Sequence, residues 1–294
     1  MNFERGYTIT ELCKQLKISR ETYYRYFRER NISKNIKEKQ SFDAAVRIAI
    51  FEIYRQSGTK RKGIYGSRKI REVLSTYIIN KKQVKLSRHQ VLRIMKKMGL
   101  ESKYNSKSFK PYSNKTKAHI YYDNLLEQRF DNHKPLEVIT SDLTYVKTAK
   151  GWRYVCFIID LFNREIIGHA ISKYHDSNCV LRALTSIKFD LNNTRIFHSD
   201  RGGEFASSEL SEYLKQLNIV QSMSRAGCPY DNAVSENMFK LLKVEGIDRY
   251  YQFDSNLILD VNEWVKWYNN VRIHSKINNK SPVMYREQHE LKAV

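Results

Sequence analysis

The sequence lacks the features of a secreted, membrane-spanning or zinc-binding protein. Its 294 residues include only four cysteines, which lie far apart, with no CxxC motif and no paired histidines nearby. These absences argue against a disulfide framework and a zinc module, and indicate a reducing compartment. The N-terminus has no apolar leader segment, and the longest apolar runs, such as YVCFII, are far shorter than the roughly 20 residues that span a bilayer. We therefore expect a cytoplasmic protein with no membrane segment.

Acidic residues are scarce in one part of the chain only. Residues 1–120 contain 30 Lys and Arg against 9 Asp and Glu, whereas residues 121–294 contain 22 of each. The net charge of +21 therefore comes entirely from the first 120 residues. Each Lys or Arg placed on a phosphate releases a condensed counterion. A basic N-terminal part, residues 1–120, called the front below, joined to a neutral globular part, therefore indicates binding to DNA. A merely solvated basic surface is the alternative.

The segment TITELCKQLKISRETYYRYFRER predicts two short helices with helix-turn-helix spacing. The first carries an apolar stripe over 9–16, and Ser19 is placed to cap the second. In the second helix, aromatic residues alternate with arginines, so one face can pack while the other touches phosphates. We therefore expect Arg20 and Arg25 to contact DNA.

A second basic helical unit follows, with helices expected over 42–56, 65–76 and 87–98 and a stop at Gly99. In the last helix the stripe Val91, Leu92, Met95 and Met98 is expected to be buried. Small three-helix bundles resemble one another in sequence, and the basic bias is what favours DNA here. The residues of this helix expected to contact DNA are Arg88, Arg93 and Lys96.

Beyond a polar segment without periodicity, the chain becomes rich in β-type residues from about 136. EVITSDLTYVK, WRYVCFIIDL and REIIGHAIS predict three strands, followed by a helix over 176–188, a strand over 194–199, a helix over 203–217, a strand over 219–224 and further helices. A meander followed by βα units indicates a mixed α/β sheet with helices on its faces. The expected parts are an N-terminal helix-turn-helix (1–38), a second helical unit (39–100), a linker (101–134) and the α/β core (135–294).

Three acidic residues stand at informative places in this core. Asp142 lies in the middle of the first strand, where aspartate is disfavoured, so it needs a raised pKa or a cation such as a divalent metal. Asp200, in HSDRGGEF, follows a later strand and meets Asp142 if the two strands are neighbours, although the same stretch is also typical of an ordinary turn. In CPYDNAVSENMFKLLK, Asp231 suits a helix N-cap, and Glu236 one turn later supplies a third carboxylate.

The chain resembles the catalytic subunit of bacterial insertion-sequence transposases of the IS-three group, the OrfB-type product with a retroviral-integrase core. The matching motifs, in chain order, are TSDLTYV, FIIDLFNREIIGHAIS, FHSDRGGEF, SRAGCPYDNAVSENMFKLLKVE and WYNNVRIHSKINNKSPVMYRE. Two positions depart from the family pattern, since Ile139 stands where Trp is usual and Asn237 where Ser is common. Neither residue is a metal ligand, so we expect these two departures to affect local packing rather than activity.

The resemblance implies a ribonuclease-H-like integrase core, with a mixed five-stranded sheet and flanking helices. It implies that a DDE triad falls on Asp142, Asp200 and Glu236. It also implies that Lys243, seven residues after Glu236, is the family's basic position on the same helix. Because a helix turns through about 700° in seven residues, Lys243 should face the same way as Glu236 and reach DNA; a lysine on a solvated helix face is the alternative.

The resemblance further implies metal-dependent phosphoryl transfer. Hard carboxylate oxygens suit Mg²⁺ or Mn²⁺, and two ions about 3.5 to 4 Å apart can bracket one scissile phosphate. By family analogy, Asp142 bridges both ions while Asp200 and Glu236 hold one each. The same site can then hydrolyse a phosphodiester at the element end and join the exposed 3′-hydroxyl to another strand. Four further polar residues lie near these motifs: His198, Arg201, Asn232 and Asn237. Each is expected either to support the site or contact DNA, or to be an ordinary cap or a satisfied surface group.

The expected partners are double-stranded DNA, both terminal inverted repeats and target, further copies of the chain, and an upstream OrfA-type protein or fusion. A retroviral-type integrase is one alternative, but its usual His-His-Cys-Cys zinc module is absent here. A ribonuclease H would not need the basic front. A domesticated DNA-binding regulator with an inactive core is the non-enzyme alternative, and the intact triad argues against it. The aromatic stripe Trp264, Trp267 and Tyr268 is interpreted as core.

Overall fold

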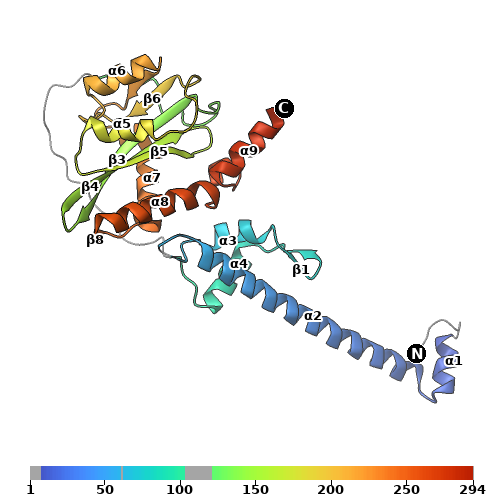
Figure 1. Cartoon of the computed structure of the whole chain (residues 1–294). Coiled ribbons are helices and arrows are strands. Elements are labelled where there is room, and N and C mark those ends of the chain that lie inside the picture. The colour runs from blue at the N-terminus through green and yellow to red at the C-terminus, as the bar shows by residue number, and fades with distance from the viewer. Residues whose placement is uncertain (1–7, 61, 103–120, 294) are drawn as a thin grey trace.

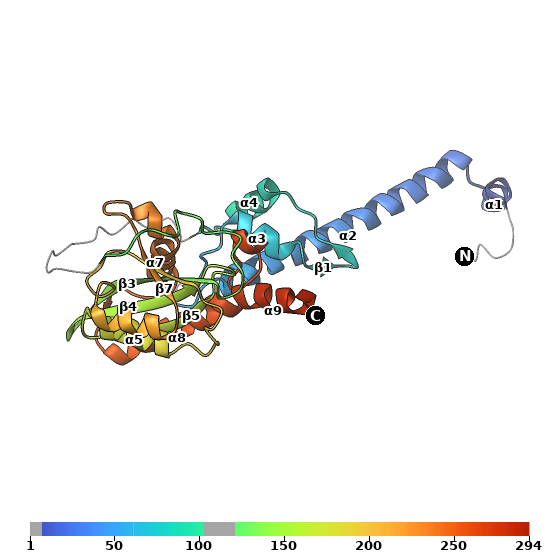
Figure 2. The same ribbon diagram turned by 90° about the horizontal axis from the view of Figure 1, so that it is seen from above.

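The computed structural model describes residues 8–60, 62–102 and 121–293, which form an extended helical front and an α/β core (Figure 1). The front begins with α1 (Ile9–Gln15), which lies beside the far end of a long helix, α2 (Arg20–Gln56) (Figures 1 and 2). Ser19 caps α2 as expected, because its hydroxyl accepts a hydrogen bond of 3.0 Å from the Thr22 amide. None of the described helices is long and apolar enough to cross a bilayer.

The expected start of a separate helix at residue 42 is wrong. α2 runs without a break through 37 residues, since neither Gly nor Pro interrupts 20–56. Two residues expected in buried stripes are also partly exposed, Leu16 at 47% and Leu92 at 36%. α1 packs against the end of α2, and Leu92 lies one step off the face that Val91 and Met95 bury.

The second helical unit packs the C-terminal half of α2 against two short helices and a hairpin. Its core includes Ile50, Ile70 and Val91, all fully buried. The capping box of Ser87 and Gln90 starts the last helix, and Gly99, with φ of +67°, ends it as expected. The elements are α3 (Ser67–Leu74), β1 (Ile78–Ile79), β2 (Lys82–Gln83) and α4 (Arg88–Lys97).

The core contains the expected mixed sheet. Its strands are β3 (Val138–Thr148), β4 (Gly151–Asp160), β5 (Ile166–Ser172), β6 (Ile196–Ser199) and β7 (Val220–Met223). The order is β5-β4-β3-β6-β7; the first three strands are antiparallel, whereas β6 and β7 run parallel to β3. A two-residue strand that the sequence did not predict, β8 (Tyr250–Tyr251), pairs with the end of β3.

Helices cover both faces of this sheet. Cys156 and Ile158 of β4 share a buried cluster with α5 and α6, whereas Phe157 and Ile159 share another with α7 and α8. Trp264 and Tyr268 are buried in the second cluster, which confirms their assignment to the core. The helix expected from residue 203 begins only at Ser208. The helices are α5 (Ser177–Thr185), α6 (Ser208–Gln216), α7 (Ala233–Glu245), α8 (Asp254–Asn270) and α9 (Pro282–Ala293).

The second helical unit is docked on the core. The Tyr65 hydroxyl accepts a hydrogen bond of 3.2 Å from the Ile273 amide, and the Tyr65 ring lies 6.5 Å from that of Trp267. Lys60 adds an ion pair of 2.6 Å with Asp260. These contacts hold α3 beside the C-terminal part of α8 (Figures 1 and 2).

Candidate active site

Two of the candidate acidic residues lie level with each other on neighbouring strands. β3 and β6 pair in parallel, with Thr140 opposite His198. Two residues further along both strands, the same register brings Asp142 level with Asp200, which follows directly after β6. The expectation that the two strands are neighbours is therefore confirmed.

The two carboxyl groups repel each other in partly buried surroundings. Burial, and next the charge of Asp200, raises the pKa of Asp142 well above its usual value. Burial and the nearby Glu204 raise the pKa of Asp200 to about 6. Single backbone hydrogen bonds, from Leu143 to Asp142 (2.8 Å) and from Gly202 to Asp200 (2.9 Å), offset only part of this effect. The pair therefore favours a bound cation or proton.

Glu236 lies in the first turn of α7, on the exposed side of the helix. Its charge contributes to the raised pKa of both Asp142 and Asp200, and burial raises its own pKa. The structure thus brings the three candidate carboxylates within electrostatic range of one another.

A fourth carboxylate, which the sequence interpretation missed, belongs to Glu204. Its side chain is buried, and Oε1 accepts a hydrogen bond of 2.9 Å from His175 Nε2. Glu204 contributes more than Glu236 to the raised pKa of Asp200. A Cβ at Gly202 would lie 2.6 Å from the Glu204 carboxylate, so a larger residue there would displace this side chain. The only signal in the sequence was its presence in HSDRGGEF.

The donor chemistry of this cluster fits a hard divalent cation. Four carboxylates supply oxygen ligands, whereas burial raises the pKa of Cys156 and Cys179 and keeps both thiols protonated. Within the described ranges, however, no three His, Cys, Asp or Glu side chains are close enough together to surround a single metal ion. The four carboxylates are therefore related through their charges and do not form a closed coordination shell.

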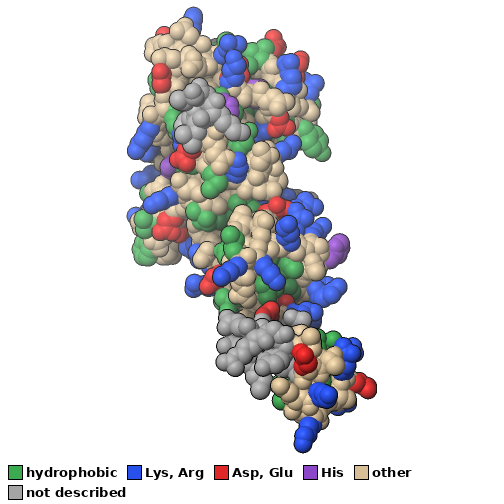
Figure 3. Space-filling view, turned by 90° about the vertical axis from the view of Figure 1, so that its right-hand side faces the viewer, with side chains coloured by type: hydrophobic (Ala, Val, Ile, Leu, Met, Phe, Trp, Pro, Cys, Tyr) green, Lys and Arg blue, Asp and Glu red, His purple; other side chains and the backbone are tan. Residues whose placement is uncertain are grey.

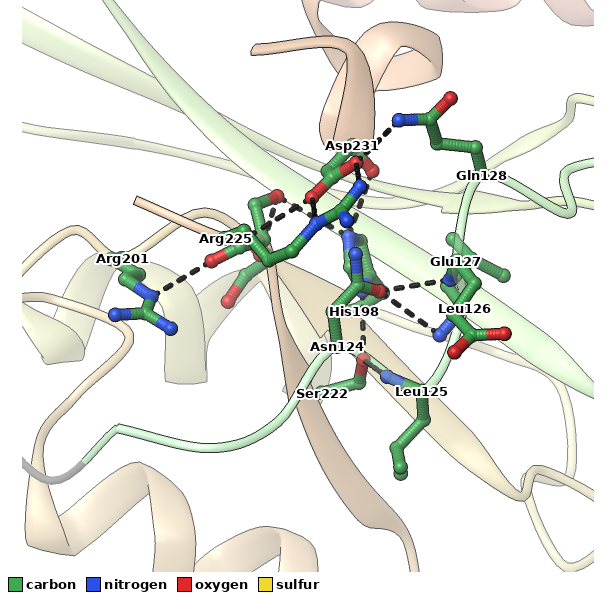
Figure 4. Close-up of polar contacts among 12 residues, drawn as sticks. Asn124, Leu125, Leu126, Glu127, Gln128, His198, Arg201, Ser222, Arg225 and Asp231 are labelled. Carbon is green, nitrogen blue, oxygen red and sulfur yellow. Dashed lines mark hydrogen bonds and ion pairs between the residues drawn. The ribbon is translucent and has the colours of Figure 1, made fainter. Parts of the chain in front are cut away.

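His198 is a buried support for this site. Figure 4 shows it within a network of polar contacts between β6, β7 and the loop before α7. Its Nε2 lies 2.9 Å from the Asp231 carbonyl oxygen, which can only accept, so Nε2 carries the proton. Burial lowers the pKa of His198 to about 4, so the ring is neutral, and Nδ1 accepts from the Ser222 hydroxyl at 2.9 Å. Both ring nitrogens are thus used within the protein.

The expectation that Asp231 is the N-cap of α7 is wrong. Its carboxylate accepts hydrogen bonds from Arg225 Nε (2.9 Å) and Gln128 Nε2 (2.7 Å) (Figure 4). The Arg225 guanidinium lowers the pKa of Asp231 below its usual range. A 3-10 turn, Pro229–Asn232, precedes the helix, so the cap position falls on Asn232, whose side chain makes no capping bond.

Asn232 instead ties the start of α7 to β3. Its side chain accepts a hydrogen bond of 2.9 Å from the Thr140 hydroxyl and donates one of 3.3 Å to the Ser141 carbonyl. Thr140 and Ser141 directly precede Asp142 on this strand. Asn232 and His198 together therefore anchor the start of α7 to both strands that carry an aspartate.

The other polar candidates lie further out. Arg201 is exposed; its Nε donates to the Ser224 carbonyl at 2.8 Å, and its guanidinium lies 5.2 Å from the Tyr121 ring centre. Asn237 is exposed on α7. Neither residue directly supports the three carboxylates.

Lys243 is not on a fully solvated face. It is partly buried, and its Nζ lies 5.1 Å from the centre of the Tyr145 ring. Burial lowers its pKa, whereas the charge of Asp142 acts in the opposite direction, so the ammonium group lies in the electrostatic range of the site. This placement agrees with the helical-wheel expectation that Lys243 and Glu236 share a side of α7.

Family models match successive parts of the chain. An "Integrase core domain" model matches residues 132–229, and a second model with the same description matches 236–289. An "HTH-like domain" matches 41–108, and a "Helix-turn-helix domain of resolvase" matches 3–30. The protein is therefore an enzyme with an integrase core behind a helix-turn-helix front.

Curated relatives define the family. Over 286 residues the chain is 31% identical to "Transposase InsF for insertion sequence IS3A" of Escherichia coli (strain K12), covering 95% of this chain and 94% of the relative. Over 229 residues it is 32% identical to "Transposase for insertion sequence element IS904" of Lactococcus lactis, covering 76% and 87%. The chain belongs to the IS3 family of insertion-sequence transposases, which confirms the resemblance seen in its motifs.

Solved structures show a more distant likeness. The HTLV-2 integrase catalytic core domain in complex with magnesium is 18% identical, with a TM-score of 0.37 over 51% of this chain and 94% of that one. The simian T-cell lymphotropic virus intasome in complex with a PP2A regulatory subunit is 14% identical, with a TM-score of 0.41 over 68% and 66%. The family assignment rests on the sequence relatives alone.

The anchoring role of Asn232 predicts a stability difference between two asparagines close together in sequence. Asn232→Ala removes two hydrogen bonds between the start of α7 and β3, although the Thr140 hydroxyl keeps its contact of 3.0 Å with the Ser235 hydroxyl, and should cost about 1–3 kcal/mol of unfolding free energy. Asn237→Ala, at an exposed site, should change it by less than about 0.5 kcal/mol. Urea unfolding followed by circular dichroism measures both, and equal effects would refute the anchor.

Proposed function

We propose that this transposase cuts DNA at the ends of its insertion sequence and joins the exposed 3′-hydroxyl groups to target DNA. Asp142, Asp200 and Glu236 would hold two Mg²⁺ or Mn²⁺ ions for both steps. The observation that carries the proposal is the level placement of Asp142 and Asp200, whose mutual repulsion makes them a cation site. The ions, when bound, activate the attacking oxygen and stabilise the leaving one.

The contribution of the chain is to fix its carboxylates before DNA arrives. Asp142 lies on a central strand and Asp200 at the end of the neighbouring one, so neither aspartate can move far without breaking the sheet. Glu236 approaches from α7, whose start Asn232 and His198 hold on the two strands. Because the same carboxylates serve water and a 3′-hydroxyl alike, hydrolysis and joining need no covalent enzyme intermediate.

The helical front would bind the DNA. Lys and Arg side chains are spread over the face shown in Figure 3, from the core to the α1 end. Terminal inverted repeats and target DNA are the proposed substrates, which places the enzyme at the nucleoid of the bacterial cytoplasm. The residues proposed to contact DNA in the front, all exposed, are Arg20 and Arg25 of α2 and Arg88, Arg93 and Lys96 of α4.

The proposed parts of the chain keep the boundaries expected from sequence: 1–38, 39–100, a linker over 101–134, of which 103–120 lies outside the described residues, and 135–294. α2 crosses the first boundary, so a single rigid helix joins the two DNA-binding units. Two element ends must be cut and joined together, so several copies would assemble on them. An upstream OrfA-type protein, separate or fused, would add further contacts to DNA.

The first prediction concerns the triad. Asp142→Asn, Asp200→Asn and Glu236→Gln should each abolish cleavage and joining of an end duplex, because a neutral amide holds a divalent ion poorly. Loss of a group outside the ligand shell typically costs 10–100-fold, so each loss here should exceed about 100-fold. Duplex affinity, measured by fluorescence anisotropy, should stay unchanged.

Glu212→Gln, at an exposed position of α6, is the matched control and should keep full activity. A triad variant with near-normal turnover would remove that residue from the assignment. A wild-type protein that binds end duplex but neither cuts nor joins it would favour the inactive regulator.

A second prediction tests Lys243. Lys243→Ala should weaken binding of end duplex and slow joining, because a phosphate contact beside the site is lost. Mn²⁺ affinity of the free protein, measured by calorimetry, should not change, since an ammonium group is no metal ligand. Lys215→Ala, at an exposed position of α6, is the control. If the two variants behave alike, Lys243 has no special contact.

A third prediction follows from the raised pKa values of the aspartates. A carboxyl group whose pKa is raised to about 6 is protonated below that pH, so activity at limiting Mg²⁺ should fall as pH drops through about 6. Glu204→Gln removes one repelling charge and lowers the pKa of Asp200, so the midpoint of the profile should shift to lower pH. An unchanged midpoint, or an upward shift, would contradict the electrostatic account.

A further inference from the structure

His175, a residue to which the proposed chemistry gives no role, reaches the edge of the candidate active site. It lies in the turn between β5 and α5, and its Nε2 is 2.9 Å from Oε1 of Glu204, in the turn between β6 and α6. β5 and β6 both run parallel to β3, so the turns that follow them lie at the same edge of the sheet. α5 and α6 also lie against each other on one face (Figure 1). The contact therefore joins two turns beside the site.

The His175 ring is held in place by its own surroundings, although half of its side chain is exposed. The ring stacks on that of Tyr154 in β4, with 4.9 Å between the ring centres and 26° between the planes. The next residue, Asp176, caps α5 by accepting a hydrogen bond of 3.1 Å from the Cys179 amide, which fixes the backbone. A ring restrained in this way loses little further freedom when it binds a carboxylate.

Glu204 depends on this partner, because its carboxylate lies in an unfavourable place. The side chain is only 6% exposed, and the like charges of Asp142 and Asp200 repel it. Within 8–60, 62–102 and 121–293, the bond from His175 is the only hydrogen bond that this carboxylate receives. A buried and repelled carboxylate without a donor would turn out to solvent. His175 therefore determines where the carboxylate of Glu204 lies.

The Glu204 carboxylate, so held, rests on the backbone of Gly202. A Cβ at Gly202 would lie 2.6 Å from both Cδ and Oε1 of Glu204. The Gly202 amide donates a hydrogen bond of 2.9 Å to Oδ1 of Asp200, and the Gly202 carbonyl accepts one of 3.0 Å from the Phe205 amide. A continuous chain of contacts thus runs from His175 through Glu204 and Gly202 to Asp200.

The end of this chain of contacts sets the orientation of Asp200. Oδ1 is bound by the Gly202 amide, whereas Oδ2 accepts no hydrogen bond in the part of the chain that the structure describes. One oxygen is therefore held by the turn and the other is left for a cation. If the turn moved, Asp200 could rotate into another rotamer, and a ligand must be held within about 0.5 Å of its productive position.

We propose that His175 is a positioning residue for Asp200. By holding the Glu204 carboxylate on Gly202, it keeps the turn after β6 in the form in which the Gly202 amide binds Oδ1 and leaves Oδ2 for a divalent ion. The inference rests on the proposed function for the assignment of Asp200 as a metal ligand. His175 acts through Glu204 and needs no contact with metal or DNA.

The test compares three replacements of His175 in the full-length chain. The amide nitrogen of Gln lies about as far from the backbone as Nε2 of His, whereas that of Asn lies nearer, at the place of Nδ1. His175→Gln can therefore keep the hydrogen bond to Glu204, and His175→Asn and His175→Ala cannot. Mn²⁺ affinity of the free protein, measured by calorimetry, should fall about 10-fold in the Asn and Ala variants and stay near that of the wild type in the Gln variant.

Cleavage of an end duplex gives a second readout. The Mg²⁺ concentration for half-maximal cleavage should rise about 10-fold in His175→Ala and His175→Asn, because the metal site is less well ordered. The rate at saturating Mg²⁺ should change much less, since all the ligands are present. A merely structural histidine would give a lower melting temperature and a lower rate at every Mg²⁺ concentration, with unchanged metal affinity, and this result would overturn the proposal.

Gly202→Ala breaks the same chain of contacts from its other side. Gly202 has no positive φ, so Ala does not strain the backbone there, and its methyl group displaces the Glu204 carboxylate. The variant should lose Mn²⁺ affinity as His175→Ala does, and the double variant should lose no more than either single one. Additive losses would contradict a shared chain of contacts. His289→Ala, at an exposed position of α9, is the control and should bind Mn²⁺ like the wild type.

The outcomes separate this inference from the proposed function. Wild-type Mn²⁺ affinity and Mg²⁺ dependence in every His175 variant would refute the positioning role and leave the chemistry intact. An equal loss in His175→Gln and His175→Ala would also refute it, because the hydrogen bond would then not be the cause. A wild type whose Mn²⁺ binding depends on His175 but which neither cuts nor joins DNA would refute the chemistry and keep the positioning role. A wild type that neither binds Mn²⁺ nor cuts would refute both.

Discussion

The parallel pairing of β3 and β6 is the constraint on which the site depends. Its register, with Thr140 opposite His198, places Asp142 level with Asp200 and forces two carboxylates together in partly buried surroundings. A sheet would not tolerate this repulsion without compensation, and within the described residues each carboxylate receives a single backbone hydrogen bond. Glu204 and Glu236 add further negative charge, so the cluster favours a bound cation or proton, and a divalent cation would offset this charge strongly.

α7 connects this constraint to the rest of the molecule. Its first turn carries Glu236, and its second half carries Lys243 beside Tyr145. Its last residue, Glu245, forms a buried ion pair with Arg272, which directly precedes Ile273 at the contact with Tyr65. A single helix of 13 residues therefore runs from the candidate carboxylates to the junction with the helical front. The position of DNA bound at the front is thereby fixed relative to the site by a helix and not by a loop.

Much of the fold could be predicted because its signals are local. The alternation in β3, the apolar run of β4 and the cap at Ser19 each act within a few residues. The continuous α2 was missed because a weakly amphipathic polar stretch without Gly or Pro does not show where a helix stops. Glu204 was missed because burial of one acidic residue among 22 depends on tertiary contacts, here with His175. Asp231 likewise has the composition of a cap, yet Arg225 and Gln128 bind it from outside the helix.

The central claim is that the carboxylates act on the scissile phosphate through divalent metal ions. The most direct measurement replaces the leaving 3′-oxygen at the cleavage position of an end duplex with sulfur and compares cleavage rates in Mg²⁺ and in Mn²⁺. A softer ion tolerates sulfur better, so the account predicts that cleavage of the sulfur substrate is strongly slowed in Mg²⁺ and substantially restored in Mn²⁺. Equal slowing in both metals, with the unmodified duplex cleaved normally in each, would contradict direct metal contact with the leaving oxygen.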